Sequence, residues 1–168
     1  MDLREFVDFP ARTILTVTPG QLGPIRDDVR EIKELVLDLT IQKSGEEYFC
    51  QGKLMGKLVI ECSRCLSDFE ADLVEPTNFI ICSAIRTADK DVIDDEDYAF
   101  FKGNDLRVDL TEIIYQALVL SLPMKPLCSE TCRGLCPVCG INLNQSECDC
   151  PGKVPDTRWE GLKGLLEQ

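Results

Sequence analysis

The chain has 168 residues, enough to bury an ordinary hydrophobic core, and its formal net charge is −12 at pH 7. It contains ten cysteines and no histidine, which excludes Ser-His-Asp and Cys-His catalytic arrangements, His-Glu-x-x-His metalloproteases and mixed Cys/His zinc sites. The acidic charge opposes broad binding to nucleic-acid phosphates and favours a basic partner.

The N-terminal sequence favours a cytoplasmic protein. Met1–Glu5 lacks the basic segment and following apolar stretch of a targeting peptide, and no apolar run approaches the roughly 18 residues of a membrane span. We therefore expect a cytoplasmic location without membrane contact. In a reducing compartment, closely paired cysteines are more often metal ligands than disulfides, so metal binding is favoured over a disulfide framework.

Alternating apolar residues predict an antiparallel β-meander in the first half of the chain. A short apolar stretch at 14–17 is typical of an edge strand. From residue 35 the period of two sharpens, and it predicts half-buried strands at 35–41, 48–60, 69–73 and 79–81.

An acidic run follows at residues 89–97, with six acidic side chains and one lysine. Most such runs are solvated loops, and the alternative is a docking surface for a basic protein. The run lacks the glycine-centred spacing of a calcium loop, so calcium binding is not expected.

The clearest helical pattern predicts a main helix over about 109–122. Asp109 is the expected N-cap, Glu112 follows three residues later as in a capping box, and Pro123 ends the helix. Its apolar stripe is expected to pack on the sheet. The predicted fold class is α+β: an antiparallel β-meander packed by one main helix, followed by a small Cys-rich, zinc-binding C-terminal region.

The sequence predicts that the chain is divided into two regions. A β-sheet body occupies 1–123, and a cysteine-rich zinc knuckle region with a short docking tail occupies 124–168. In the tail, Trp159, Leu162 and Leu166 share one helical face, although two glycines weaken a helix there. The tail is expected to dock on its own domain or to become ordered on a partner.

Eight of the ten cysteines form four close pairs. Cys136-Pro-Val-Cys139-Gly is typical of a zinc knuckle, and Cys148-Asp-Cys150 completes a tetrahedral shell if this pair lies in a turn. Cys62-Ser-Arg-Cys65 falls at the hairpin tip between the strands predicted at 48–60 and 69–73. We predict two structural zinc sites, named here the first cluster (Cys62, Cys65, Cys128 and Cys132) and the second cluster (Cys136, Cys139, Cys148 and Cys150).

Other assignments of the cysteines stay open from sequence. The alternative is a single zinc ion bound by Cys132, Cys136, Cys139 and either Cys148 or Cys150. In that case Cys62 and Cys65 bind no metal. Cys50 and Cys82 lie on strand patterns with apolar neighbours and are expected in the core. A shell of four thiolates leaves no position for water, which is typical of structural zinc, so we do not expect an enzyme.

These motifs resemble the bacterial YceD family, which is named for accumulation of large-subunit ribosomal RNA. The resemblance rests on Glu61-Cys62-Ser-Arg-Cys65-Leu66, the helix that ends in Leu122-Pro123, the run from Cys128 to Gly-Leu-Cys136-Pro-Val-Cys139-Gly-Ile-Asn-Leu-Asn144, Cys148-Asp-Cys150 and a terminal Asp-x-Arg. It implies a role in producing or stabilising this RNA, with no established catalytic activity. Family members can carry proline in the terminal motif where this chain has Thr157.

The predicted function is a non-enzymatic, zinc-stabilised factor that supports synthesis, processing or stability of large-subunit ribosomal RNA. The expected partner is a large-subunit precursor, through its RNA or a basic ribosomal protein, and no small-molecule substrate is expected. The expected contact surface comprises a small knob with Arg133, Asn142, Asn144 and Lys153, together with the Trp159 tail. The alternative is a thiol-redox-sensing or chaperone-like zinc protein, although Cys62 lacks the strand-then-helix setting of a thioredoxin motif.

Overall fold

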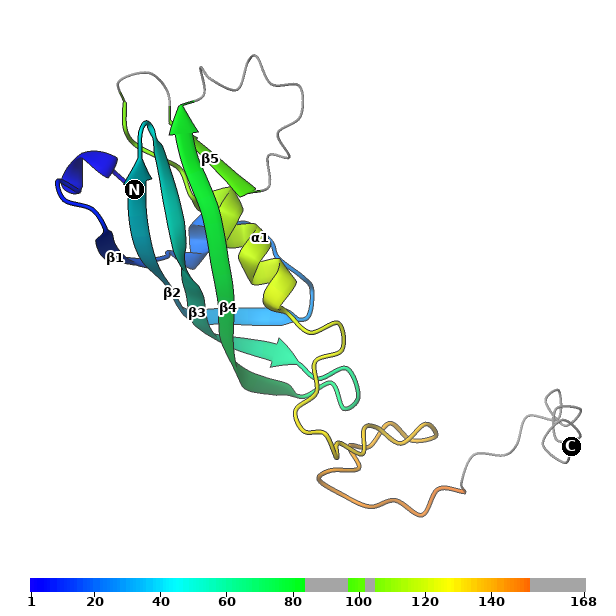
Figure 1. The fold of residues 1–168 in the computed structure, drawn as a ribbon. Coiled ribbons are helices and arrows are strands. Elements are labelled where there is room, and N and C mark those ends of the chain that lie inside the picture. The colour runs from blue at the N-terminus through cyan, green and yellow to red at the C-terminus, as the bar shows by residue number, and fades with distance from the viewer. Residues whose placement is uncertain (84–96, 102–104, 152–168) are drawn as a thin grey trace, which may run out of the picture.

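The computed structural model describes residues 1–83, 97–101 and 105–151 (Figure 1). Its body is a five-stranded sheet in the order β1-β2-β3-β4-β5. The strands are β1 (Ala11–Thr16), β2 (Val29–Ser44), β3 (Glu47–Glu61), β4 (Asp68–Ser83) and β5 (Tyr98–Phe101). Two short 3-10 helices, η1 (Leu3–Glu5) and η2 (Pro19–Gln21), and one α-helix, α1 (Thr111–Ser121), accompany the sheet.

The first four strands form the predicted antiparallel meander, but β5 pairs in parallel with β4. The sheet is therefore mostly antiparallel: the predicted meander is confirmed for the first four strands, and the parallel fifth strand was not predicted from the sequence. A parallel neighbour requires a connection that returns the chain to the same end of the sheet, and the segment 84–96 between the two strands is long enough to do so.

β4 joins two stretches that the sequence pattern separates at Glu75-Pro76. It runs unbroken from Asp68 to Ser83 along β3. β5 pairs only with Ile80 to Ser83, so Pro76 lies where β4 has a single neighbouring strand. A proline is tolerated there because its missing N–H does not interrupt a ladder on both sides.

The core lies between one face of the sheet and α1 (Figure 1). Its β2 contribution is the alternating row predicted from sequence, Leu35, Leu37, Leu39 and Ile41, each at most 1% exposed. From α1 come Ile113, Ile114, Ala117 and Leu118. The two cysteines outside the clusters, Cys50 in β3 and Cys82 in β4, are buried as predicted. No helix in the described part of the chain is long and apolar enough to cross a membrane.

The start of α1 differs from the predicted capping box. The helix begins at Thr111 after Leu110, which makes no side-chain cap bond. The Asp109 carboxylate instead accepts from the backbone N–H and hydroxyl of Thr111, at 2.9 and 2.6 Å. Glu112 accepts from Gln116 at 3.2 Å. The helix is confirmed and its capping box is wrong, because the aspartate forms a local turn two residues long.

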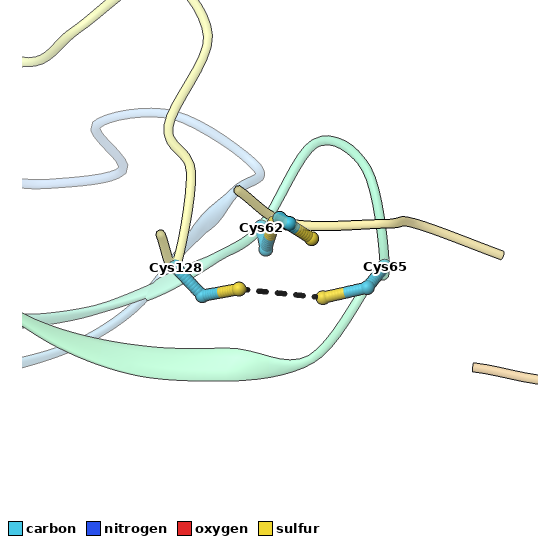
Figure 2. A group of neighbouring side chains, drawn as sticks. Cys62, Cys65 and Cys128 are labelled. Atoms are coloured by element: carbon cyan, nitrogen blue, oxygen red, sulfur yellow. Dashed lines mark hydrogen bonds between the residues drawn. The ribbon is translucent and has the colours of Figure 1, made fainter. Parts of the chain in front are cut away.

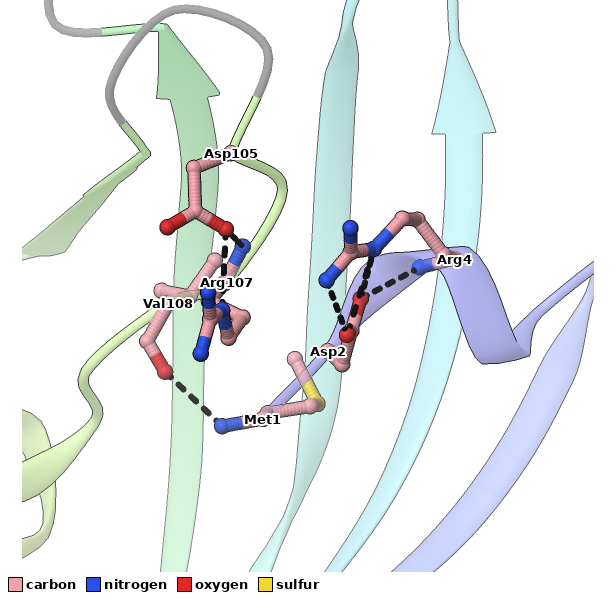
Figure 3. Close-up of polar contacts among 6 residues, drawn as sticks. All are labelled: Met1, Asp2, Arg4, Asp105, Arg107 and Val108. Carbon is pink, nitrogen blue, oxygen red and sulfur yellow. Dashed lines mark hydrogen bonds and ion pairs between the residues drawn. The ribbon is translucent and has the colours of Figure 1, made fainter.

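The first residues of the chain close one end of the core by pairing with the segment before α1 (Figure 3). The Met1 ammonium donates to the Val108 carbonyl at 2.8 Å, and the Val108 N–H donates to the Met1 carbonyl at 2.8 Å. Leu3 N–H donates to the Leu106 carbonyl at 3.0 Å, and the Leu3 side chain is 2% exposed. This segment is therefore an integral part of the body.

The acidic run at 89–97 lies outside the described residues except for Asp97, which is exposed. The predicted docking tail, with Trp159, lies wholly outside them.

We predict that Gly52→Ala destabilises the sheet. A Cβ at Gly52 would lie 2.0 Å from the Asp38 carbonyl oxygen of β2, so the strands would have to move apart. Overpacking of this kind costs about 1 to 3 kcal/mol, and each kcal/mol lowers the melting temperature by about 2 to 4 °C in a chain of this size. Thermal unfolding checks this. Gly20→Ala is the control, since nothing lies within 4 Å of its added Cβ; equal melting temperatures for the two variants would contradict the prediction.

Candidate metal centres

The first cluster gathers at the tip of the β3–β4 hairpin. Cys62 and Cys65 come from the turn between the strands, and Cys128 and Cys132 come from the segment that follows α1 (Figure 2). The four sulfurs lie within 4.8 Å of one another. The Cys62–Cys132 sulfur distance is 3.8 Å and the Cys65–Cys128 distance is 3.7 Å.

These distances fit a tetrahedral metal shell. Zinc–sulfur bonds of about 2.3 Å give a regular tetrahedron edges of about 3.8 Å. A disulfide would instead bring two sulfurs to about 2.05 Å. All ten cysteines are free thiols. The first cluster thus has the donor atoms and the spacing of a closed, four-sulfur metal site.

A tight turn directs the two hairpin thiols to one side. Cys62 N–H donates to the Ser67 carbonyl at 3.0 Å, and Leu66 N–H donates to the Cys62 carbonyl at 2.9 Å. Leu66 takes a left-handed φ of 55°, which reverses the chain. The Arg64 N–H lies 3.5 Å from the Cys62 sulfur. This arrangement is the metal-knuckle geometry that the Cys-x-x-Cys spacing predicts.

Arg64 fastens the segment after α1 to the hairpin tip. Its guanidinium donates to the carbonyls of Glu130 and Cys132, at 3.2 and 3.1 Å. Its own carbonyl accepts from Leu135 N–H at 3.2 Å. Gly134, with a φ of +73°, lies directly against the Arg64 backbone. A Cβ added at Gly134 would lie 3.0 Å from the Arg64 carbonyl oxygen. The two halves of the first cluster are therefore held together by backbone contacts as well as by their sulfurs.

The second cluster repeats the knuckle further along the chain. Gly140 N–H donates to the Cys136 carbonyl at 2.9 Å, and Gly140 has a φ of 74°, as expected for the reversal after Cys-Pro-x-Cys. Cys148 and Cys150 bring their sulfurs within 4.8 Å of those of Cys136 and Cys139. This cluster is the more accessible one, since Cys139 is exposed and Cys148 and Cys150 are half-buried.

Hydrogen bonds in the first cluster favour negative charge on two of its sulfurs. The pKa of Cys62 is lowered to about 6: burial raises it, but backbone N–H groups, first that of Cys128, donate to the sulfur and outweigh burial. The pKa of Cys132 is lowered in the same way, with burial opposed by the Asn144 amide. The Cys128 thiol donates to Cys132, and this raises the pKa of Cys128 to about 12.

Hydrogen bonds in the second cluster likewise lower the pKa of one thiol and raise that of another. Backbone N–H groups of Cys139 and Val138 lower the pKa of Cys136 to about 6. The Cys150 thiol donates to Cys139, which raises the pKa of Cys150 to about 12. The core residue Cys50 differs, because burial alone raises its pKa to about 12. In each cluster, binding of a soft dication would displace thiol protons, because the metal ligand is the thiolate.

The structure brings the eight cysteines together in the two groups of four that the sequence predicts. The single-site alternative needs Cys132 beside Cys136 and Cys139, but Cys132 lies in the first cluster. Both groups consist of sulfur alone, which suits zinc, and four thiolates leave no coordination position for water. Among the described residues, these are the sets of side chains spaced to hold a metal ion.

Two functional roles were not anticipated from the sequence. Arg64 holds the segment after α1 against the hairpin tip. Its position between two cysteines of an exposed turn does not indicate this role. Asn142 and Asn144, expected on a contact surface, are engaged internally: Asn144 Nδ2 donates to the Cys132 sulfur at 3.3 Å, and Asn142 Nδ2 donates to Ser67 at 3.0 Å. Of the expected knob, Arg133 is free to point outward, with 58% of its side chain exposed. Lys153 lies outside the described residues.

Fold and clusters together define a class: an α+β protein with two groups of four cysteines suited to a soft metal ion. A family model described as Large ribosomal RNA subunit accumulation protein YceD matches residues 50–166. This is more than half of the chain, and the protein belongs to that family. The family description names RNA accumulation and no reaction.

The relatives extend this assignment. An uncharacterized protein of Mycobacterium tuberculosis is 29% identical over 165 residues, which are 98% of this chain and 73% of that protein. The chloroplastic YCED homolog 1 of Arabidopsis thaliana, also named a large ribosomal RNA subunit accumulation protein, is 33% identical over 76 residues, 45% of this chain and 24% of its own. The corresponding Zea mays protein is 36% identical over 59 residues, 34% of this chain and 20% of its own. No solved structure matches the chain.

The hydrogen bonds to Cys136 predict a pH dependence of metal retention in the second cluster. Val138→Pro removes the N–H that lies 3.5 Å from the Cys136 sulfur, so the pKa of this thiol rises toward its ordinary value of 9.0. Protons then compete with the metal at higher pH, and acid release of the metal moves upward in pH. Metal release followed during an acid titration measures this shift. Val138→Ala keeps the N–H and should release metal as the unmodified protein does; an unshifted Val138→Pro titration would refute the role of this bond.

Proposed function

We propose that this protein is a non-enzymatic, zinc-stabilised factor that supports the synthesis, processing or stability of large-subunit ribosomal RNA. The observation that carries the proposal is the family match over residues 50–166, whose printed description is accumulation of this RNA. Chloroplastic relatives from Arabidopsis thaliana and Zea mays carry the same description. The cysteine clusters supply the means by which the C-terminal part would be held in shape.

Zinc in both clusters would order the C-terminal part of the chain. Structural zinc contributes roughly 10 to 16 kcal/mol of apparent binding energy, against about 5 to 15 kcal/mol for the whole stability of a typical domain. We therefore retain the division into a sheet body at 1–123 and a zinc knuckle region with a docking tail at 124–168. The first zinc would tie the hairpin tip to the segment after α1, and the second would shape the knuckle beyond it.

The surface around the clusters supports a contact role. The Arg133 side chain is 58% exposed and pairs with Glu147 at 3.9 Å. Leu66 at the hairpin tip and Val138 in the second knuckle are 56% and 61% exposed. Exposed cationic and apolar side chains on the segments that carry the cysteines suit a macromolecular partner more than a small-molecule substrate.

The proposed partner is a precursor of the large ribosomal subunit in the cytoplasm, contacted through its RNA or through a basic ribosomal protein. The net charge of −12 favours the protein, because an acidic body attracts basic chains and repels phosphates at long range. Arg133, Val138 and Leu66 would form the contact region, with Lys153 and Trp159 of the tail continuing it. Membrane contact and a small-molecule substrate form no part of the proposal.

One observation favours a second candidate, a thiol-redox-sensing or chaperone-like zinc protein. The pKa values of Cys62 and Cys136 are lowered to about 6, and the thiolate is the form that oxidants attack. Against this candidate, Cys62 is fully buried. Zinc release by mild peroxide, coupled to a gain of activity that zinc return reverses, would establish it.

We predict two zinc ions per chain. Cys62→Ser should retain one, since three sulfurs of the first cluster hold zinc poorly, and Cys139→Ser should retain the other. Cys50→Ala is the control and should retain both, because Cys50 lies in the sheet core. Metal analysis of the purified full chain gives the stoichiometry. A single zinc in the unmodified protein would contradict the assignment.

The partner prediction uses a matched pair of valines. Val138 in the second knuckle and Val74 in β4 are similarly exposed, at 61% and 66%. Val138→Asp should reduce cross-linking in cells to large-subunit proteins or precursor ribosomal RNA about tenfold, and Val74→Asp should leave it unchanged. Cross-linked material is identified by mass spectrometry and RNA sequencing. Recovery of metabolic enzymes alone, or equal effects of the two variants, would contradict the proposed contact region.

A further inference from the structure

A side chain from the second cluster's loop touches a ligand of the first cluster. The loop 140–147 connects the two cysteine pairs of the second cluster. From it, Asn144 Nδ2 donates to the Cys132 sulfur at 3.3 Å. The amide is fixed in this orientation, because its Oδ1 accepts from Arg133 N–H at 2.7 Å. Each polar atom of the Asn144 side chain is therefore committed to the first cluster or its neighbour.

The rest of the loop is docked on the same region. Leu143 N–H donates to the Gly134 carbonyl at 2.9 Å, and Leu135 and Asn142 form a β-bridge. Asn142 Oδ1 accepts from the backbone N–H and side-chain amide of Asn144, at 3.0 and 2.9 Å. Asn142 Nδ2 reaches Ser67 of the hairpin at 3.0 Å. The loop is thus a strut between the second cluster and the hairpin tip.

The position of both ends of loop 140–147 depends on the second cluster. Loop 140–147 starts directly after Cys139 and stops directly before Cys148, so a metal that joins these two sulfurs fixes both ends of the loop. Without that metal the loop retains only its hydrogen bonds, many of which are exposed to water. A hydrogen bond to a metal-bound thiolate orients the ligand and stabilises its charge, and loss of such a partner typically lowers metal affinity 10- to 100-fold.

We propose that the two clusters form one coupled metal unit, in which metal binding by the second cluster holds Asn144 against Cys132 and thereby raises the metal affinity of the first cluster. The inference rests on the two metal sites of the proposed function. Coupling of this kind is reciprocal, so metal in the first cluster also raises the affinity of the second. Asn144 acts as a positioning residue and is not itself a ligand.

The coupling gives the hairpin clamp a sensitivity to metal supply. The second cluster is the more accessible one, because only Cys136 of its four cysteines is buried, whereas in the first cluster only Cys128 is exposed and the other three are each at most 4% exposed. Metal exchange with the surroundings would therefore occur first at the second cluster. Metal loss there would release Asn144 and weaken the first cluster, in which three of the four cysteines are buried.

A double-variant cycle on the full chain tests the coupling. Cys139→Ser, Asn144→Ala and the combination are titrated with Zn²⁺ against a competing chelator, and the NMR amide signal of Arg64 reports occupancy of the first cluster. Each single variant should lower first-cluster affinity about tenfold. The combined variant should be no weaker than either single variant, because both remove the same interaction. Multiplied effects, or an unchanged first-cluster affinity in Cys139→Ser, would overturn the proposal.

Two further variants keep the test decisive. Gln145→Ala lies in the same loop, is exposed, and should leave the affinity unchanged. If Asn144→Ala fails to fold, Ser67→Ala takes its place. This variant removes only the hydroxyl that accepts from Asn142 Nδ2, and it should lower the metal affinity of the first cluster by a smaller factor. An unchanged affinity would overturn the coupling. If the unmodified chain binds two zinc ions but the cycle shows independent sites, the coupling alone fails. If the unmodified chain does not bind two zinc ions, the proposed metal sites are wrong.

Discussion

Four closely spaced sulfurs, three of them on buried cysteines, cannot all carry negative charge without a cation between them, and this constraint governs the hairpin end of the molecule. Cys62, Cys65 and Cys132 are nearly inaccessible to water, yet their sulfurs and that of Cys128 meet at tetrahedral spacing. Backbone and amide N–H groups favour negative charge on Cys62 and Cys132, because they lower the pKa of each thiol. A soft dication would satisfy all four sulfurs at once, and under the proposed function it would serve as a mechanical clamp and not as a reagent.

The sheet positions the cysteines of the first cluster. The β3–β4 pairing ends at Glu61 and Asp68, so the turn that carries Cys62 and Cys65 projects from the end of a long, well-packed hairpin. α1 packs on the same sheet, and the chain leaves it toward that end. The sheet body therefore fixes one half of the first cluster, and a metal bound there would determine how the C-terminal part follows. Any contact surface on that part would inherit its position from the cluster.

The sequence was most informative where one period or one spacing decides the outcome. The alternation from Leu35 to Ile41 predicted the buried row of β2, because side chains on a strand alternate between faces, and Cys-x-x-Cys spacing predicted the knuckles. The parallel direction of β5 was not predictable, since it depends on how a long connection returns. Asp109 satisfied the capping pattern but used a shorter turn. Asn144 looked like a surface residue because its contact with Cys132 arises only when two loops meet in space.

Hydrogen exchange of the full chain, with and without zinc, tests the clamp most directly. The amides of Cys132, Leu135 and Cys136 donate to carbonyls in the cluster region, whereas those of Leu37 and Ile41 lie in the sheet core. Removal of zinc is expected to abolish protection at the cluster amides and to leave the sheet amides protected. Unchanged protection of the cluster amides in the metal-free chain would contradict a metal clamp.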